Sequence, residues 1–256
     1  MTAPRTYQTE AIIIKRIKLG EADRILTFYT PGLGKLKAVA KGTRRPQSKL
    51  GGPVELLTHS RLMLARGRNL DIITQAQTIN NFLPIKDDLE RTSRGLYIAE
   101  LIDAFTGEHI EDRRLFNLVL ETLHQLSQVN DYEPVLRYFE LHLLDHLGYR
   151  PQLQHCTECN SPLKPEANFF SASQGGVLCR DCGYHEPIAR PISLNALKVL
   201  RLWQNCDYAT ARRVKINPAL ATELEQVLRE YIKYLMERQL KSTAWLDKLK
   251  QETHPM

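Results

Sequence analysis

The spacing of apolar residues changes once along the chain, a little after residue 80. Before that point, β-branched and aromatic residues gather in short runs separated by glycine and proline, which is typical of strands joined by tight turns. From residue 87 onward, apolar positions recur every three or four residues, the period of an amphipathic helix. The pattern predicts an α+β chain with β-structure first and helices after it.

Five strands are expected in the first region, at residues 11–15, 24–30, 35–41, 55–64 and 70–79. A five-stranded set of this size fits an oligonucleotide/oligosaccharide-binding (OB) barrel, which uses an open face and its loops to bind nucleic acid. An SH3-like barrel fits the strand count almost as well, so the strand pattern leaves both open.

The helical region contains three apolar faces before residue 150 and two more after residue 192. Gly148 is suited to the left-handed residue that ends a helix, and Pro151 prevents continuation. Ser193 is a candidate N-cap, and Asn217 followed by Pro218 is typical of an N-cap and first-turn pair.

Four of the five cysteines form two Cys-x-x-Cys pairs, with nineteen residues between the pairs: Cys156, Cys159, Cys179 and Cys182. This spacing is typical of a structural zinc site with four thiolate ligands. Four thiolates leave no open coordination position for water, so the site is expected to hold one structural Zn²⁺ ion rather than a catalytic one. The alternative is that the four cysteines are reduced and do not come together at one site.

Positive charge is concentrated at the start of the chain. Residues 1–81 carry 14 Lys or Arg and 5 Asp or Glu, although the whole chain has a net charge of only +6. Such a block attracts polyanions and gives salt-dependent affinity for nucleic acid. A solvated basic surface that only maintains solubility is the alternative.

The cations that we expect to contact DNA lie in one strand, the loop after it and the following hairpin. In the strand, a period of two places Lys35, Lys37 and Lys41 on one side. Phosphate contacts should dominate because aromatic residues are sparse here. The full set is Lys35, Lys37, Lys41, Arg44, Arg45, Lys49, Arg61, Arg66 and Arg68.

The sequence favours a non-enzymatic protein of a reducing compartment. It has no secretory leader pattern and no long apolar run, and paired cysteines suit a metal site in the cytoplasm better than a disulfide framework. It also lacks the complete H-x-E…P-C-x-x-C signature of zinc deaminases and a Walker phosphate loop. Two alternatives stay open: a zinc-ribbon factor that binds RNA or the ribosome, and a metal-dependent enzyme that modifies nucleic acid.

Several segments together resemble the RecO family of recombination-mediator proteins. Near the N-terminus these are GEADRI at 20–25 and GKLKAVAKG at 34–42, followed by Arg44 and Arg45. Further along they are RYFELHLL at 137–144, LGYRP at 147–151 leading into Cys156, and GGVLC at 175–179 after Phe170. Each segment is modest alone, but together they follow the family's order over most of the chain.

This resemblance implies an N-terminal OB domain and a helical domain with an inserted zinc segment. We expect the OB domain at 1–81, the first helical part at 82–152, the zinc insert at 153–188 and the second helical part at 189–256. In function, the resemblance implies DNA repair and recombination, with binding of single- and double-stranded DNA and annealing of complementary strands.

The resemblance also implies partners. With RecR, family members help to replace single-strand-binding protein by RecA, and their helical domain binds the acidic, apolar tail of single-strand-binding protein. In this chain the candidates for that contact are Arg201, Arg212, Arg213 and Lys215. Solvated helix faces explain these four basic residues about as well.

Overall fold

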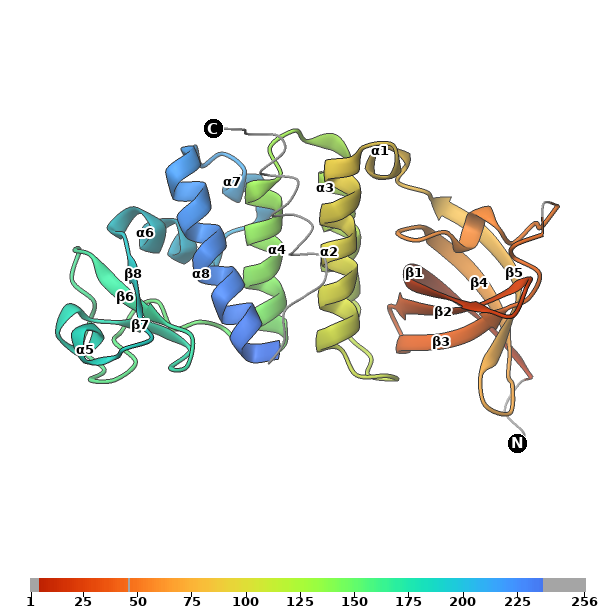
Figure 1. Ribbon diagram of the computed structural model, residues 1–256, viewed down its shortest axis with the longest axis horizontal. Helices are drawn as coiled ribbons and strands as arrows, with labels where there is room; N and C mark the ends of the chain where they lie inside the picture. Colours follow the sequence, from red (N-terminus) through yellow and green to blue (C-terminus); the bar gives the residue numbers. More distant parts are fainter. Residues whose placement is uncertain (1–4, 46, 237–256) are drawn as a thin grey trace. The chain divides into compact units, whose positions relative to one another are not determined.

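The computed structural model describes residues 5–45 and 47–236 (Figure 1). These residues form two compact units, which meet in sequence between Gln128 and Val129. The first unit contains the β-barrel and three helices. The second contains the remaining helices and the four cysteines.

Five strands close into a barrel in the order β1-β2-β3-β5-β4. This confirms the prediction of a five-stranded OB-type barrel at the N-terminus. Their bounds are β1 Thr6–Leu19, β2 Asp23–Thr30, β3 Gly34–Ala40, β4 His59–Ala65 and β5 Asp71–Asn80. All neighbouring strands are antiparallel except β3 and β5.

β1 is much longer than predicted, because it pairs with two neighbouring strands in succession. It pairs with β4 from Thr6 to Ile12 and with β2 from Ile12 onward, with a register shift between Ile13 and Lys15. The prediction also began the fourth strand too early, at residue 55. Leu57 has a φ of 58°, a left-handed conformation that strand residues do not adopt.

The barrel core consists of the inward side chains of all five strands, including Leu26, Phe28, Leu62 and Leu64. At one end, Val54 from the short 3-10 helix Gly52–Val54 completes this core, and Leu50 packs against it. That end of the barrel is therefore plugged by apolar side chains.

Helices α1 (Leu83–Lys86), α2 (Leu89–Phe105) and α3 (Arg113–Gln128) belong to the same unit as the barrel. α2 packs against β1 and α3 against β2. The rings of Tyr29 in β2 and Phe116 in α3 stack with centroids 6.5 Å apart. Part of the outer barrel face is thus covered by helices.

The second unit contains α4 (Glu133–His146), α6 (Leu194–Trp203), α7 (Tyr208–Ala211) and α8 (Pro218–Met236). The predicted helix ends are confirmed: Ser193 Oγ accepts from Ala196 N at 3.1 Å, and Asn217 Oδ1 accepts from Leu220 N at 2.8 Å. Gly148 follows α4 with a φ of 78°.

Between α4 and α6 lies a small sheet of three strands in the order β7-β6-β8, with one short helix. These elements are β6 (Asn168–Ser171), β7 (Gly176–Leu178), α5 (Arg180–His185) and β8 (Arg190–Ile192). Phe170 packs edge-on against Tyr231 of α8, with ring centroids 5.6 Å apart. The cysteine-bearing segment is thereby attached to the helices of its own unit.

The domain boundaries predicted at residues 82, 153 and 189 stay predictions. The structure groups α1, α2 and α3 with the barrel, because α2 and α3 pack against barrel strands and α1 packs against both of these helices.

Candidate nucleic-acid interface and metal centre

Lys35, the first predicted DNA contact, is buried. Its side chain lies on the outer face of β3, but only 9% of it is exposed. The Nζ atom donates to the backbone oxygen of Asp103 in α2 and lies 3.4 Å from the Asp103 carboxylate. Lys35 therefore connects the barrel to α2.

Asp103 receives a second cation from the barrel. Lys15 Nζ donates to its carboxylate at 2.7 Å. Burial alone would raise the pKa of Asp103, but Lys15 and Lys35 together hold that pKa below its usual value. This ion cluster is a structural feature of the interface between the barrel and α2.

Lys37 also has a carboxylate partner, although both side chains remain nearly half exposed. Its Nζ lies 2.5 Å from Glu108 Oε1. Their hydrogen bond raises the pKa of Lys37 and lowers the pKa of Glu108. Glu108 is held next to β3 because His109 N donates to Lys35 O at 3.1 Å.

The four cations after β3 differ from the two within it. Lys41, Arg44, Arg45 and Lys49 are exposed, and no described carboxylate pairs with any of them. Arg44 Nη1 has one long contact, 3.5 Å to the backbone oxygen of Gly20. We call these residues the loop cluster.

The loop that carries this cluster is held in place by backbone contacts. Gly42, at a φ of 67°, donates its N–H to Asp23 Oδ1 at 2.8 Å. Arg44 N donates to Ala22 O at 3.1 Å, and Thr43 between them is buried. The loop is therefore tied to the turn between β1 and β2, with its cations directed outward.

The remaining predicted cations lie elsewhere on the barrel. Arg61 on β4 is 3.6 Å from Glu10 Oε1. Arg66 is in the β4–β5 hairpin, with its guanidinium 5.3 Å from the ring centroid of Tyr7, and Arg68 is exposed beyond it.

The strand register separates these cations from the loop cluster. In β1, Leu19 pairs with Asp23 at one end and Thr6 pairs with Ala65 at the other. The loop cluster lies at the first end and the β4–β5 hairpin at the second, which is the lower end of the barrel in Figure 1. The loop cluster and the hairpin cations thus lie at opposite ends of the barrel, whereas Lys35, Lys37 and Arg61 lie within its strands.

The four predicted metal ligands converge. The Sγ atoms of Cys156, Cys159, Cys179 and Cys182 all lie within 4.8 Å of one another. Ligands about 2.3 Å from a tetrahedral ion lie about 3.8 Å apart. The Cys159 and Cys179 sulfur atoms are already at 3.9 Å, so the donor set fits a four-thiolate metal site with small adjustments. His155 and His185 are not in this cluster.

Local backbone structure aims the thiolates at one point. Asn160 N donates to Cys156 O at 3.0 Å, and Gly183 N donates to Cys179 O at 2.9 Å, so each Cys-x-x-Cys pair forms one tight turn. Gly183 is required for space rather than for its backbone angle, because an added Cβ would lie 2.2 Å from the Phe169 ring.

The Cys159 thiol ionises more readily than an ordinary cysteine thiol. Hydrogen bonds from the Ser161 hydroxyl and backbone N–H lower the pKa of Cys159 to about 6. The hydrogen bond shared with Cys179 raises the pKa of Cys182. A bound cation would favour the thiolate form of all four cysteines.

The four basic candidates for partner binding are not equivalent. Arg201 is partly buried, and its Nε donates to Leu153 O at 2.7 Å, next to the cysteine segment. Burial lowers the pKa of Arg201. Arg212, Arg213 and Lys215 are exposed after α7. Arg201 thus has a structural role that the other three lack.

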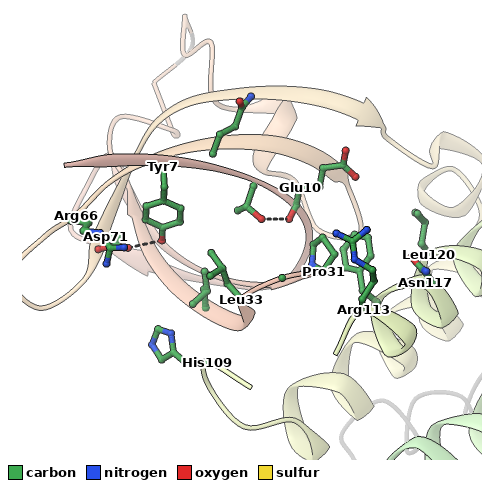
Figure 2. A pocket seen from close by; sticks show the side chains of 15 residues that line it. Tyr7, Glu10, Pro31, Leu33, Arg66, Asp71, His109, Arg113, Asn117 and Leu120 are labelled. Atoms are coloured by element: carbon green, nitrogen blue, oxygen red, sulfur yellow. Dashed lines mark hydrogen bonds between the residues drawn. The ribbon is translucent and has the colours of Figure 1, made fainter. Parts of the chain in front are cut away.

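Sequence reasoning missed a pocket of about 670 Å³ at the lower end of the barrel (Figure 2). Its walls are the start of β1, the turn between β2 and β3, the β4–β5 hairpin and the beginning of α3. Figure 2 shows Arg66 and Asp71 on one side and Arg113 and Asn117 on the other. The sequence signal was Pro31, directly after β2, because proline ends strand pairing.

Comparison with known proteins agrees with this architecture. A family model described as "Recombination protein O N terminal" matches residues 1–82, and one described as "Recombination protein O C terminal" matches residues 86–244. The chain belongs to the RecO family. The resemblance inferred from the sequence motifs is therefore confirmed.

Curated relatives match over nearly the whole chain. "DNA repair protein RecO" of Roseiflexus sp. (strain RS-1) is 44% identical over 247 residues, which cover 96% of this chain and 87% of that protein. The protein of the same name from Dehalococcoides mccartyi (strain ATCC BAA-2266 / KCTC 15142 / 195) is 41% identical, with 97% and 98% covered. This RecO-family chain is therefore similar, over nearly its whole length, to proteins named DNA repair protein RecO.

Among residues 5–45 and 47–236, no helix has both the length and the apolar composition that a membrane span requires. The cytoplasmic, nucleoid-associated location expected from the sequence stays a prediction.

Proposed function

We propose that this protein is a recombination mediator that binds single- and double-stranded DNA and anneals complementary strands. The observation that carries the proposal is the loop cluster. In a RecO-family barrel, four exposed cations without carboxylate partners among the described residues extend from a loop fixed to the barrel. Such cations bind phosphates and release counterions without reading the bases.

Annealing follows from the same electrostatics. Two complementary strands repel each other through their phosphates, and cations that neutralise part of this charge let the bases approach and pair. The protein makes and breaks no covalent bond in this process, so it needs no catalytic group. We infer that it is not an enzyme.

The proposed partners are RecR, single-strand-binding protein and, indirectly, RecA. With RecR, the protein would help RecA to load on DNA that is coated by single-strand-binding protein. Arg212, Arg213 and Lys215 stay candidates for the acidic tail of that protein because they are exposed. Arg201 is the weakest candidate because it already donates to Leu153 O.

We also propose that the four cysteines hold one structural Zn²⁺ ion. The donor set consists of thiolates only, and four of them complete a tetrahedron. The ion would supply folding energy to the small sheet, whereas catalysis needs an open coordination position.

The decisive experiment measures annealing of complementary oligonucleotides coated with single-strand-binding protein, with and without RecR. We expect the protein to accelerate annealing of the coated strands, and the variant Arg44→Ala/Arg45→Ala/Lys49→Ala to lose most of that acceleration. The matched control is Lys37→Ala, which removes a β3 cation that is already paired with Glu108. Equal annealing by the triple variant and the unmodified protein would overturn the proposal, as would cleavage or modification of the DNA.

A further inference from the structure

Among the residues that the structure describes, no strand pairs with one edge of the first half of β1. Arg5 O accepts from Arg66 N at 2.9 Å, and Ile13 N donates to Thr58 O at 3.1 Å, so residues 5 and 13 both bond on the β4 side. Backbone groups of successive strand residues alternate between the two edges. The odd-numbered residues of this half therefore face β4, and the even-numbered ones face the opposite edge.

On that opposite edge β2 stops too soon to cover it. Ile12 pairs with Tyr29, but the chain reaches Pro31 two residues later and turns away. In the described part of the chain, no strand pairs with Thr6, Gln8 or Glu10 on this side. The Glu10 carbonyl accepts a local bond from the Thr9 hydroxyl at 3.0 Å, which leaves the Gln8 N–H and C=O and the Glu10 N–H directed outward.

This edge lies in the wall of the pocket in Figure 2. Leu33 supplies exposed apolar surface, with Leu36 and Phe116 buried behind the pocket wall, and Arg66, His109 and Arg113 supply positive or hydrogen-bonding groups. Figure 2 places Arg66 and Arg113 at opposite sides of this space.

The charges of the pocket favour an acidic occupant. Its two carboxylates already have partners: Asp71 accepts from Tyr7 Oη at 2.6 Å and from Gly67 N at 3.0 Å, and Glu10 lies 3.3 Å from His59 Nε2. Within residues 5–45 and 47–236, no carboxylate pairs with Arg113 or Arg66, and the Arg66 guanidinium lies 5.3 Å from the ring centroid of Tyr7.

We propose that the open edge of β1 is a docking site for an extended segment of a partner protein in which acidic and apolar residues alternate. The segment adds a strand to β1 through main-chain hydrogen bonds with Gln8 and Glu10. Because successive side chains of a strand point to opposite faces, apolar residues meet Leu33 while carboxylates reach Arg66 and Arg113.

A peptide fits this edge better than a polynucleotide. The edge offers N–H donors and C=O acceptors in alternation, which a peptide main chain matches group by group. The sugar-phosphate backbone offers acceptors repeatedly and cannot match the carbonyl groups. The open stretch of five residues spans about 17 Å, enough for a peptide of similar length.

The test uses the full chain and a fluorescein-labelled six-residue peptide of alternating aspartate and valine. We expect binding in fluorescence anisotropy, and slower hydrogen exchange of the Gln8 and Glu10 amides in NMR. The same peptide with every second backbone nitrogen methylated should lose binding, because it can no longer donate to the edge. A peptide with lysine in place of aspartate should also fail to bind.

Two matched pairs of variants locate the contact. Gln8→Pro removes the outward N–H, while Gln8→Ala keeps it. Arg113→Glu reverses a charge in the pocket wall, while Arg114→Glu changes an exposed neighbour outside it. We expect the first member of each pair to weaken peptide binding roughly tenfold and the second to change it little. If Gln8→Pro does not fold, the arginine pair decides.

Equal peptide affinity for Arg113→Glu and Arg114→Glu would overturn the proposal. So would undiminished binding of the methylated peptide. A third contradictory result is protection of the Gln8 and Glu10 amides by oligothymidylate but not by the peptide, which would assign the pocket to nucleic acid.

Discussion

Strand β3 and the loop that follows it carry similar positive charge but use it differently. Lys35 and Lys37 within β3 bond to Asp103 and Glu108, which belong to α2 and to the segment after it. Lys41, Arg44, Arg45 and Lys49 in the loop have no described carboxylate partner. One set of cations stabilises the fold, and the other is left to attract an external anion.

The difference shows why charge density alone does not identify a binding surface. A cation that is already neutralised by a carboxylate contributes little to counterion release when DNA binds. The carboxylate partner must be located before a basic residue is assigned to DNA. Substitutions of inward-facing groups should therefore change stability most, and those of exposed groups least.

The largest effect is expected for the four cysteines, because their thiol groups converge on one point. Cys179→Ser should lose the metal and unfold the small sheet around it, because structural metal ions supply much of the folding energy of such segments. Metal content after dialysis and near-UV circular dichroism measure both effects. Cys206→Ser, outside the cluster, should leave both unchanged. Full metal retention by the Cys179 variant would contradict the assignment.

Lys35→Ala should lower the free energy of unfolding by about 2–3 kcal/mol, because it leaves the partly buried Asp103 with one cation fewer. Urea denaturation measures this change. Lys41→Ala, which removes an exposed cation, should stay within about 0.5 kcal/mol of the unmodified protein. Equal stability of the two variants would erase the contrast between strand and loop.

The contrast extends to pH through His142, which is partly buried. Burial lowers the pKa of His142, whose Nε2 lies 3.0 Å from Trp203 O. The unfolded chain therefore takes up this proton at higher pH than the folded chain, and stability falls as pH drops below about 6.5. Urea midpoints at pH 5.5 and 7.5 should differ, and His142→Gln should reduce the difference. An unchanged difference would assign the pH dependence to other groups.

Lys37→Ala should have a smaller effect than Lys35→Ala. Its pair with Glu108 is nearly half exposed, and exposed pairs contribute less than about 1 kcal/mol. A double-mutant cycle of Lys37→Ala and Glu108→Ala measures the coupling directly. A coupling as large as the Lys35 effect would place Lys37 among the buried contacts.

Local features were predictable from the sequence. The strand runs, the caps at Ser193 and Asn217 and the cysteine pairs each depend on a few neighbouring residues, and the structure has all of them. The length of β1 was not predictable, because β1 passes from β4 to β2 at Ile12 and its pairing with β2 contains a register shift, so no simple pattern marks its length.

Features that depend on distant residues were also missed. The role of Lys35 depends on Asp103, which is 68 residues away. The pocket combines the start of β1 with residues of α3, so no local window of sequence contains it. Pro31, which ends β2, is evident in the sequence. The consequence, an edge on the first half of β1 with which no described strand pairs, depends on the register between the two strands.

The central claim is that the loop cluster, and not the lysines of β3, binds the phosphate backbone. Its most direct test is the slope of log affinity against log salt concentration for a single-stranded oligonucleotide. Arg44→Ala/Arg45→Ala/Lys49→Ala should flatten this slope by about 0.7 for each phosphate that the variant no longer neutralises, or about 2 in total, while Lys37→Ala leaves it nearly unchanged. A slope unaffected by the triple substitution but flattened by Lys37→Ala would contradict the claim.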